Sequence, residues 1–231
     1  MTKSLVIFAL FYLLNTSLNA VEKIIIILGP PGSGKGTQTQ LLKEKLNWPS
    51  LAVSAIKAQE HINRPEMLPI YEEIRKDQWT KDIFKSGLML VNISKNKDCE
   101  GIILENWPRT PEALSALLLT VPKKIKVIEL FAPEAVLLAR VKNRQQCPQC
   151  GASYGHARRE KIESICDECT SSLITRLSDS ADTFPRRLSE YRQRQMNFRR
   201  TFEEQGIAID QIYALGDAAD IHEQIMTSVQ N

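Results

Sequence analysis

A glycine-rich loop with one lysine, GPPGSGKGT at residues 29–37, contains the residue types that bind phosphate groups. Its glycines let successive backbone N–H groups converge on phosphate oxygens without obstruction by side chains. Lys35 adds a mobile cation for the β- and γ-phosphates of a nucleotide. The candidate phosphate ligands are therefore Gly32, Ser33, Gly34, Lys35, Gly36 and Thr37.

The segments on either side of this loop must hold it in place. KIIIIL at 23–28 is an apolar run of mostly β-branched residues, which predicts a strand buried on both faces of a parallel sheet. TQTQLLKEKLN at 37–47 has helical spacing, and the N-terminal end of that helix would point at the phosphates. The alternative, a glycine-rich turn that binds no ligand, does not account for strand, lysine and helix together.

A second group of candidate residues follows another apolar run, GIILE at 101–105. Glu105 ends this predicted strand, and a carboxylate near a phosphate loop can hold Mg²⁺ through the water ligands of the ion. Arg109, just beyond, offers a planar, bidentate contact to a phosphate. Taken alone, this stretch could also be a solvated surface turn.

Four cysteines form two Cys-x₂-Cys pairs with 15 residues between them: Cys147, Cys150, Cys166 and Cys169. Two such pairs can place four thiolates around one tetrahedral zinc ion, so the spacing predicts a structural zinc site. The alternative is two disulfides, which would suit an exported protein. Cys99 lies outside this set, and we expect it to be a free thiol.

Length and charge exclude some classes of protein. The 231 residues suffice for one core with small insertions, and a net charge of +3 is too small to indicate a nucleic-acid partner. Residues 1–20 contain Lys3, ten apolar residues and a small-residue stretch ending at Ala20, which is typical of a cleaved signal peptide. Ten apolar residues are too few for a membrane span, which needs about 20. We therefore expect export to the periplasm or exterior and no stable membrane insertion after cleavage; the alternative is a cytoplasmic protein with an attached extension or a misassigned start.

The loop variant GPPGSGKGTQ, with Gly36 where most phosphate loops have Ser or Thr, resembles the adenylate kinase family of nucleoside monophosphate kinases. The resemblance covers residues 21 to about 225 and includes the Pro-Arg-Thr at 108–110 and the two cysteine pairs. It also includes five arginines at positions that match a phosphoryl-transfer site: Arg109, Arg140, Arg144, Arg176 and Arg187.

The resemblance implies that the protein is an ATP:AMP phosphotransferase, which makes two ADP by direct in-line transfer of a phosphoryl group. It also implies Mg²⁺ as the cofactor and a structural Zn²⁺ in a lid. Arg140 would lie over the ATP adenine, and Arg144 would reach the transferred phosphates. Arg109, Arg176 and Arg187 would contact the monophosphate. The catalytic set would be Lys35, Arg109, Arg144, Arg176 and Arg187, with Glu105 associated with Mg²⁺. We expect ATP and a nucleoside monophosphate as the partners of a monomer.

The resemblance also implies a fold, an α/β three-layer core of the P-loop type with a parallel sheet. Residues 21–50, 81–142 and 181–231 would form this core. A small helical insertion at 51–80 would bind the monophosphate, and residues 143–180 would form the zinc lid.

The sequence departs from the family on the monophosphate side. The family has Ser-Thr-Gly-Asp and then an arginine, whereas this chain has Ala58 at the arginine position and these residues at the tetrad: Ala52, Val53, Ser54 and Ala55. Glu112 lies nearest the glutamine that reads adenine in the family, and a carboxylate cannot both donate to and accept from the base. Two alternatives follow: a kinase for another monophosphate, UMP or CMP, or a catalytically impaired nucleotide-binding protein.

Overall fold

The computed structural model describes residues 21–53, 55–56, 78–120, 124–149, 152–155, 160–175 and 182–230. The expected leader at 1–20 and most of the expected insertion at 51–80 lie outside these residues. Four residues named in the sequence predictions also lie outside them: Ser54, Ala58, Cys150 and Arg176.

The core is a parallel sheet of five strands in the order β2-β3-β1-β4-β8. The strands are β1 (Lys23–Leu28), β2 (Ser50–Ala52), β3 (Gly101–Glu105), β4 (Lys124–Phe131) and β8 (Ile209–Tyr213). β1 is central and pairs with β3 on one side and β4 on the other. This arrangement confirms the α/β class and the two buried parallel strands predicted at 23–28 and 101–105.

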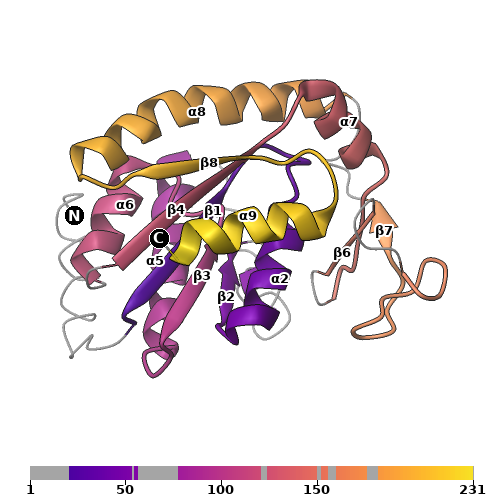
Figure 1. The fold of residues 1–231 in the computed structure, drawn as a ribbon, viewed down its shortest axis with the longest axis horizontal. Coiled ribbons are helices and arrows are strands. Elements are labelled where there is room, and N and C mark those ends of the chain that lie inside the picture. Colours follow the sequence, from indigo (N-terminus) through magenta and orange to yellow (C-terminus); the bar gives the residue numbers. More distant parts are fainter. Residues whose placement is uncertain are drawn as a thin grey trace.

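Helices cover both faces of the sheet, because alternate residues of each buried strand face opposite layers. Ile24 and Ile26 of β1 pack in the cluster that contains α5 (Gln78–Lys95), α6 (Pro111–Thr120) and α8 (Phe184–Glu204). Ile25 and Ile27 pack against α2 (Lys35–Leu46) and α9 (Ala218–Gln230) on the opposite face. Figure 1 shows α8 running along one side of the sheet, with α9 and α2 on the other.

A second, smaller sheet has three antiparallel strands in the order β6-β5-β7. These are β5 (Gln145–Gln146), β6 (Ser153–Tyr154) and β7 (Ile174–Thr175). They follow α7 (Glu134–Lys142) and lie at the right of Figure 1, away from the central sheet. All three strands fall within residues 143–180, the segment expected to form a lid.

The segment expected to form the insertion, 51–80, overlaps one described strand and one described helix at its ends. β2 extends to Ala52, two residues into the segment assigned to the insertion, and α5 begins at Gln78. Within the described residues, no helix is both long enough and apolar enough to cross a membrane.

Candidate active site

The glycine-rich loop joins the end of β1 to the start of α2. Lys35 is the first residue of α2, and its Nζ donates to the carbonyl oxygen of Pro30 at 2.8 Å and lies 3.4 Å from Ser33 Oγ. Gly32 and Gly34 in the loop have left-handed backbone angles, with φ of 82° and 92°. Such angles strain any residue with a Cβ, so the conformation of the loop depends on glycine.

The surroundings of these two glycines differ. A Cβ on Gly32 would lie 2.4 Å from the carbonyl oxygen of Leu137 in α7, so this glycine also allows α7 to pack against the loop. A Cβ on Gly34 would meet nothing within 4 Å. The backbone at Gly34, which is the N-cap of α2, is therefore open to a ligand at the positive end of the helix.

Lys35 is buried, with 9% of its surface exposed. Burial lowers its pKa to about 7; the negative charge of Glu105 opposes this shift, and the positive charges of Arg144, Arg109 and Arg187 add to it. Three cations and one carboxylate therefore act on this lysine, and the carboxylate has the largest effect of the four charges. Such a cluster favours the binding of a polyanion, which would restore the charge of the lysine.

Glu105 and Arg109 lie on the turn that follows β3. Asn106 has φ of 55°, a left-handed conformation that asparagine tolerates better than most residues, and its N–H donates to Ile27 in β1 at 2.8 Å. The Trp107–Pro108 peptide bond is cis, and Trp107 is buried. Arg109 Nε donates to the carbonyl oxygen of Asn106 at 2.7 Å. The turn therefore fixes the guanidinium of Arg109 beside the end of β3.

A cleft of about 420 Å³, the phosphate cleft, opens over these residues. Five cationic side chains and two carboxylates line it: Lys35, Arg109, Arg144, Arg187, Arg194, Glu105 and Glu190. Four of the five cations are residues predicted from the sequence as phosphate contacts. Ala52 and Val53, from the end of β2, contribute an uncharged wall. The excess of positive charge makes this cleft suited to phosphate groups.

Arg140 lines a different cleft, of about 800 Å³, between α7 and the loop that follows β8. It donates from its guanidinium to the carbonyl oxygen of Ala214 at 2.9 Å, and burial lowers its pKa. Leu215 and Gly216 line the same space. Arg144 lies two residues beyond the end of α7 and lines the phosphate cleft instead, so the two arginines belong to two different clefts.

α8 contributes residues to the phosphate cleft that the sequence pattern does not predict. Tyr191, Arg194, Gln195 and Phe198 line it together with Arg187. Their spacing of three, four and seven residues from one another places them on one helix face. The signal that could have identified them is this periodicity counted from Arg187.

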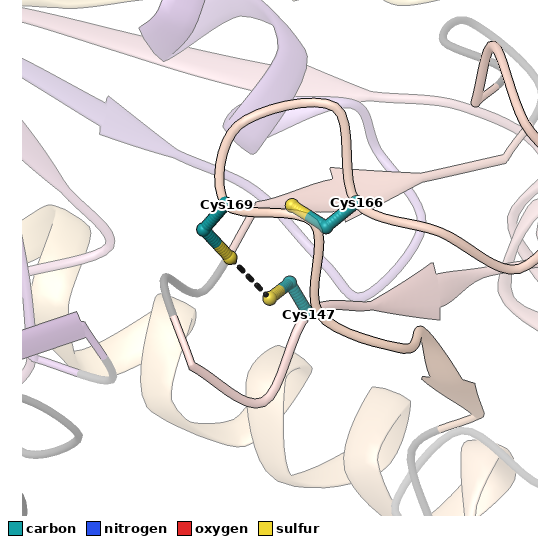
Figure 2. Close-up of side chains that lie close together, drawn as sticks. All are labelled: Cys147, Cys166 and Cys169. Atoms are coloured by element: carbon teal, nitrogen blue, oxygen red, sulfur yellow. Dashed lines mark hydrogen bonds between the residues drawn. The ribbon is translucent and has the colours of Figure 1, made fainter.

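Three of the four paired cysteines lie together in the small sheet. The Sγ atoms of Cys147, Cys166 and Cys169 all lie within 4.8 Å of one another, and those of Cys147 and Cys169 are 3.4 Å apart. Figure 2 shows the three side chains converging, Cys147 from the segment after β5 and the other two from one loop. The separation of 3.4 Å is too long for a disulfide of about 2.05 Å, and no disulfide joins any two of the cysteines that the structure describes.

Neighbouring groups hold the thiols in place. The backbone N–H of Cys147 donates to Ala152, and that of Cys166 donates to Ser171. The hydroxyl of Tyr154 lies 3.4 Å from the Cys166 sulfur and accepts from the N–H of Asp167. Three buried or half-buried sulfurs with this spacing match tetrahedral coordination by thiolates.

Comparison with known proteins finds one family model and several relatives that share a single name. The family described as AAA domain matches residues 28–149. A protein of Clostridium botulinum (strain Langeland) named adenylate kinase is 37% identical over 175 residues, which cover 72% of this chain and 80% of that relative. Adenylate kinases of Ruminiclostridium cellulolyticum and Clostridium kluyveri are 34% and 30% identical, over 72% and 79% of this chain and 81% and 87% of their own lengths.

Proposed function

The chain belongs to the adenylate kinase family, and we propose on this basis that it transfers the γ-phosphoryl group of ATP to AMP and releases two ADP. The observation that carries the proposal is the phosphate cleft. There the phosphate loop, the turn after β3, the segment after α7 and the helix α8 bring Lys35 and four arginines to one space.

The described residues support direct transfer between two bound nucleotides. The backbone of the phosphate loop and Lys35 would hold the ATP phosphates, while Arg109 would hold the acceptor phosphate. Arg144 and Arg187 would spread the charge that develops on the group in transit. The attacking oxygen of a monophosphate is already ionised, so the reaction needs neither a general base nor a covalent enzyme intermediate.

The Mg²⁺ that accompanies ATP fits the carboxylate at the end of β3. An Oε of Glu105 lies 3.9 Å from the position that a Cβ on Gly36 would occupy, so this carboxylate faces the start of α2. Glu105 would hold the water ligands of the ion. The chemistry that Mg²⁺ would supply here is positive charge that offsets the charge of the phosphates.

The second cleft would take the base of the donor nucleotide. The planar guanidinium of Arg140 is fixed by its bond to Ala214, and a fixed guanidinium can stack on an aromatic ring. Leu215 offers an apolar contact on the same cleft. This assignment separates recognition of the base from the chemistry at the phosphates.

We further propose that the thiols of Cys147, Cys166 and Cys169 hold a structural Zn²⁺, with Cys150, outside the described residues, as the fourth ligand. The convergence of the three sulfurs supports this assignment. Bound zinc would hold the loops of the small sheet together without taking part in the reaction.

The test of the activity is a coupled assay of ADP formation with Mg-ATP and, in turn, AMP, UMP, CMP and GMP. We expect turnover with AMP above the other three, and loss of turnover in the Lys35→Ala variant. A higher rate with UMP or CMP would assign another acceptor. Binding of ATP without turnover of any monophosphate would make the chain a nucleotide-binding protein that has lost catalysis.

A further inference from the structure

Helix α8 extends along the phosphate cleft from its donor end to its acceptor end. Near its start, Phe184 and Leu188 pack on Leu137 and Val141 of α7, the helix that leads into the lid. Towards its end, Phe198 packs in the cluster that contains Val53, next to β2. A residue in the second half of α8 therefore faces the part of the cleft bounded by the end of β2.

Arg194 occupies that position. It lies seven residues after Arg187, about 10 Å further along the helix axis, and both side chains line the phosphate cleft. Ala52 and Val53, which form the wall at the end of β2, carry no charge. Among the described residues that line this end of the cleft, α8 and Arg109 would therefore supply the positive charge for a bound phosphate.

The charge of Arg194 is available to a ligand. Its side chain is exposed, and it forms no hydrogen bond or ion pair with any residue in the described part of the chain. Glu190, one turn earlier, lies 3.9 Å from Arg186 instead. Arg194 and Arg109 repel each other: after burial, the charge of Arg194 is the largest cause of the lowered pKa of Arg109, which is about 10. Two guanidiniums that repel each other in one cleft are stabilised when an anion binds between them.

We infer that Arg194 is a ligand of the acceptor phosphate and, with Arg109, grips the monophosphate at the β2 end of the cleft. This inference rests on the proposed function for the identity of the acceptor, because it assigns a residue to the acceptor half of that reaction. Arg194 would also provide a cation for the acceptor phosphate in a chain that has Ala58 where the family has an arginine.

The experiment compares Arg194→Gln, Arg194→Lys and a control, Arg200→Gln, in the full chain. Arg200 lies on the same helix and is paired with Glu204 at 2.9 Å, outside the residues that line the cleft. We expect Arg194→Gln to raise the KM for AMP on the order of tenfold or more, since a charge-assisted contact is worth roughly one to two powers of ten in affinity. The KM for ATP should stay within about twofold, Arg194→Lys should recover part of the loss, and Arg200→Gln should change neither constant.

Calorimetric titration with AMP alone separates this inference from the proposed function. If the wild-type chain turns over no monophosphate, the proposed function fails, and the AMP affinity of wild type against Arg194→Gln still decides the role of Arg194. Three results would overturn the inference. Arg194→Gln could leave the affinity or KM for AMP within twofold of wild type, it could change them only as much as Arg200→Gln does, or wild type could fail to bind AMP. Equal melting temperatures for the three variants and wild type would show that the changes in affinity and KM do not result from a loss of folded protein.

Discussion

The phenol of Tyr191 on α8 donates a hydrogen bond of 2.6 Å to the carboxylate of Glu129, a buried residue of β4. Gln195 and Arg199 of α8 donate to the same carboxylate, and so does Gln211 of β8. Burial, followed by the charge of Glu129, raises the pKa of Tyr191, so the phenol remains a donor at neutral pH. These five residues, the Glu129 cluster, attach the middle of α8 to the sheet and so set which face it turns to the phosphate cleft.

The Glu129 cluster should contribute substantially to the stability of the fold. Its four donors converge on two carboxylate oxygens, and an amide at this position would offer only one accepting oxygen. We expect Glu129→Gln to lower the free energy of unfolding by about 1–3 kcal/mol, the usual cost of a buried donor without an acceptor. Urea denaturation measures the change. The control is Glu100→Gln, which breaks the exposed pair with Lys23 and should leave the unfolding curve unchanged; equal curves for the two variants would contradict the prediction.

Binding of ATP should be linked to proton uptake at Lys35. With a pKa of about 7 in the free protein, this lysine is mostly neutral at pH 8 and mostly charged at pH 6. Phosphate groups beside it favour the charged form and raise the pKa, so binding at pH 8 should take up nearly one proton while binding at pH 6 should take up little at this site.

Titration calorimetry in two buffers of different ionisation enthalpy measures this uptake. The reference is Lys35→Arg, whose guanidinium stays charged at both pH values and should show no uptake from position 35. Subtracting this reference also removes the protons that ATP itself releases. The same proton balance for wild type and Lys35→Arg at pH 8 would show that Lys35 is already charged in the free protein.

The two left-handed glycines of the phosphate loop should respond differently to alanine. Gly34→Ala places a Cβ in open space, so only backbone strain applies, about 1–2 kcal/mol. Gly32→Ala adds a contact of 2.4 Å with the carbonyl oxygen of Leu137 and must displace α7. We expect the larger loss of unfolding free energy for Gly32→Ala; a larger loss for Gly34→Ala would mean that the loop and α7 do not pack as described.

The cysteines of the small sheet should bind zinc, whereas Cys99 should not. We expect about one zinc per purified chain by elemental analysis, much less in Cys169→Ser, and an unchanged content in Cys99→Ser. After metal removal and denaturation, a thiol titration should count all 5 cysteines of the sequence. A count of one thiol without a reductant would indicate disulfides instead.

The sequence predicts the central part of the site well, for a physical reason. A strand buried on both faces must be apolar along its whole length, which identifies β1 and β3. The residues that follow two neighbouring parallel strands lie at the same edge of the sheet, so Lys35 and Arg109 meet although 74 positions separate them.

The contribution of α8 is harder to predict. Arginines at helical spacing are typical of an exposed face, and nothing local indicates that Arg194 faces a cleft while Arg200 faces solvent. That distinction depends on the rotation of α8, which the Glu129 cluster fixes through residues more than 60 positions apart in the chain. Glu129 itself gives no local signal, since a single acid in an apolar strand is usually assigned to an exposed end.

The pairing of β5 with β7 brings together the two ends of the segment that the small sheet belongs to. Gln145 lies opposite Thr175 and Gln146 opposite Ile174, so the chain leaves the core and returns to it at neighbouring points. The segment between these two strands, residues 147–173, therefore has adjacent ends, and a segment with adjacent ends can be exchanged for a shorter one. Such an exchange would leave the core strands, the phosphate loop and the arginines that precede this segment where they are.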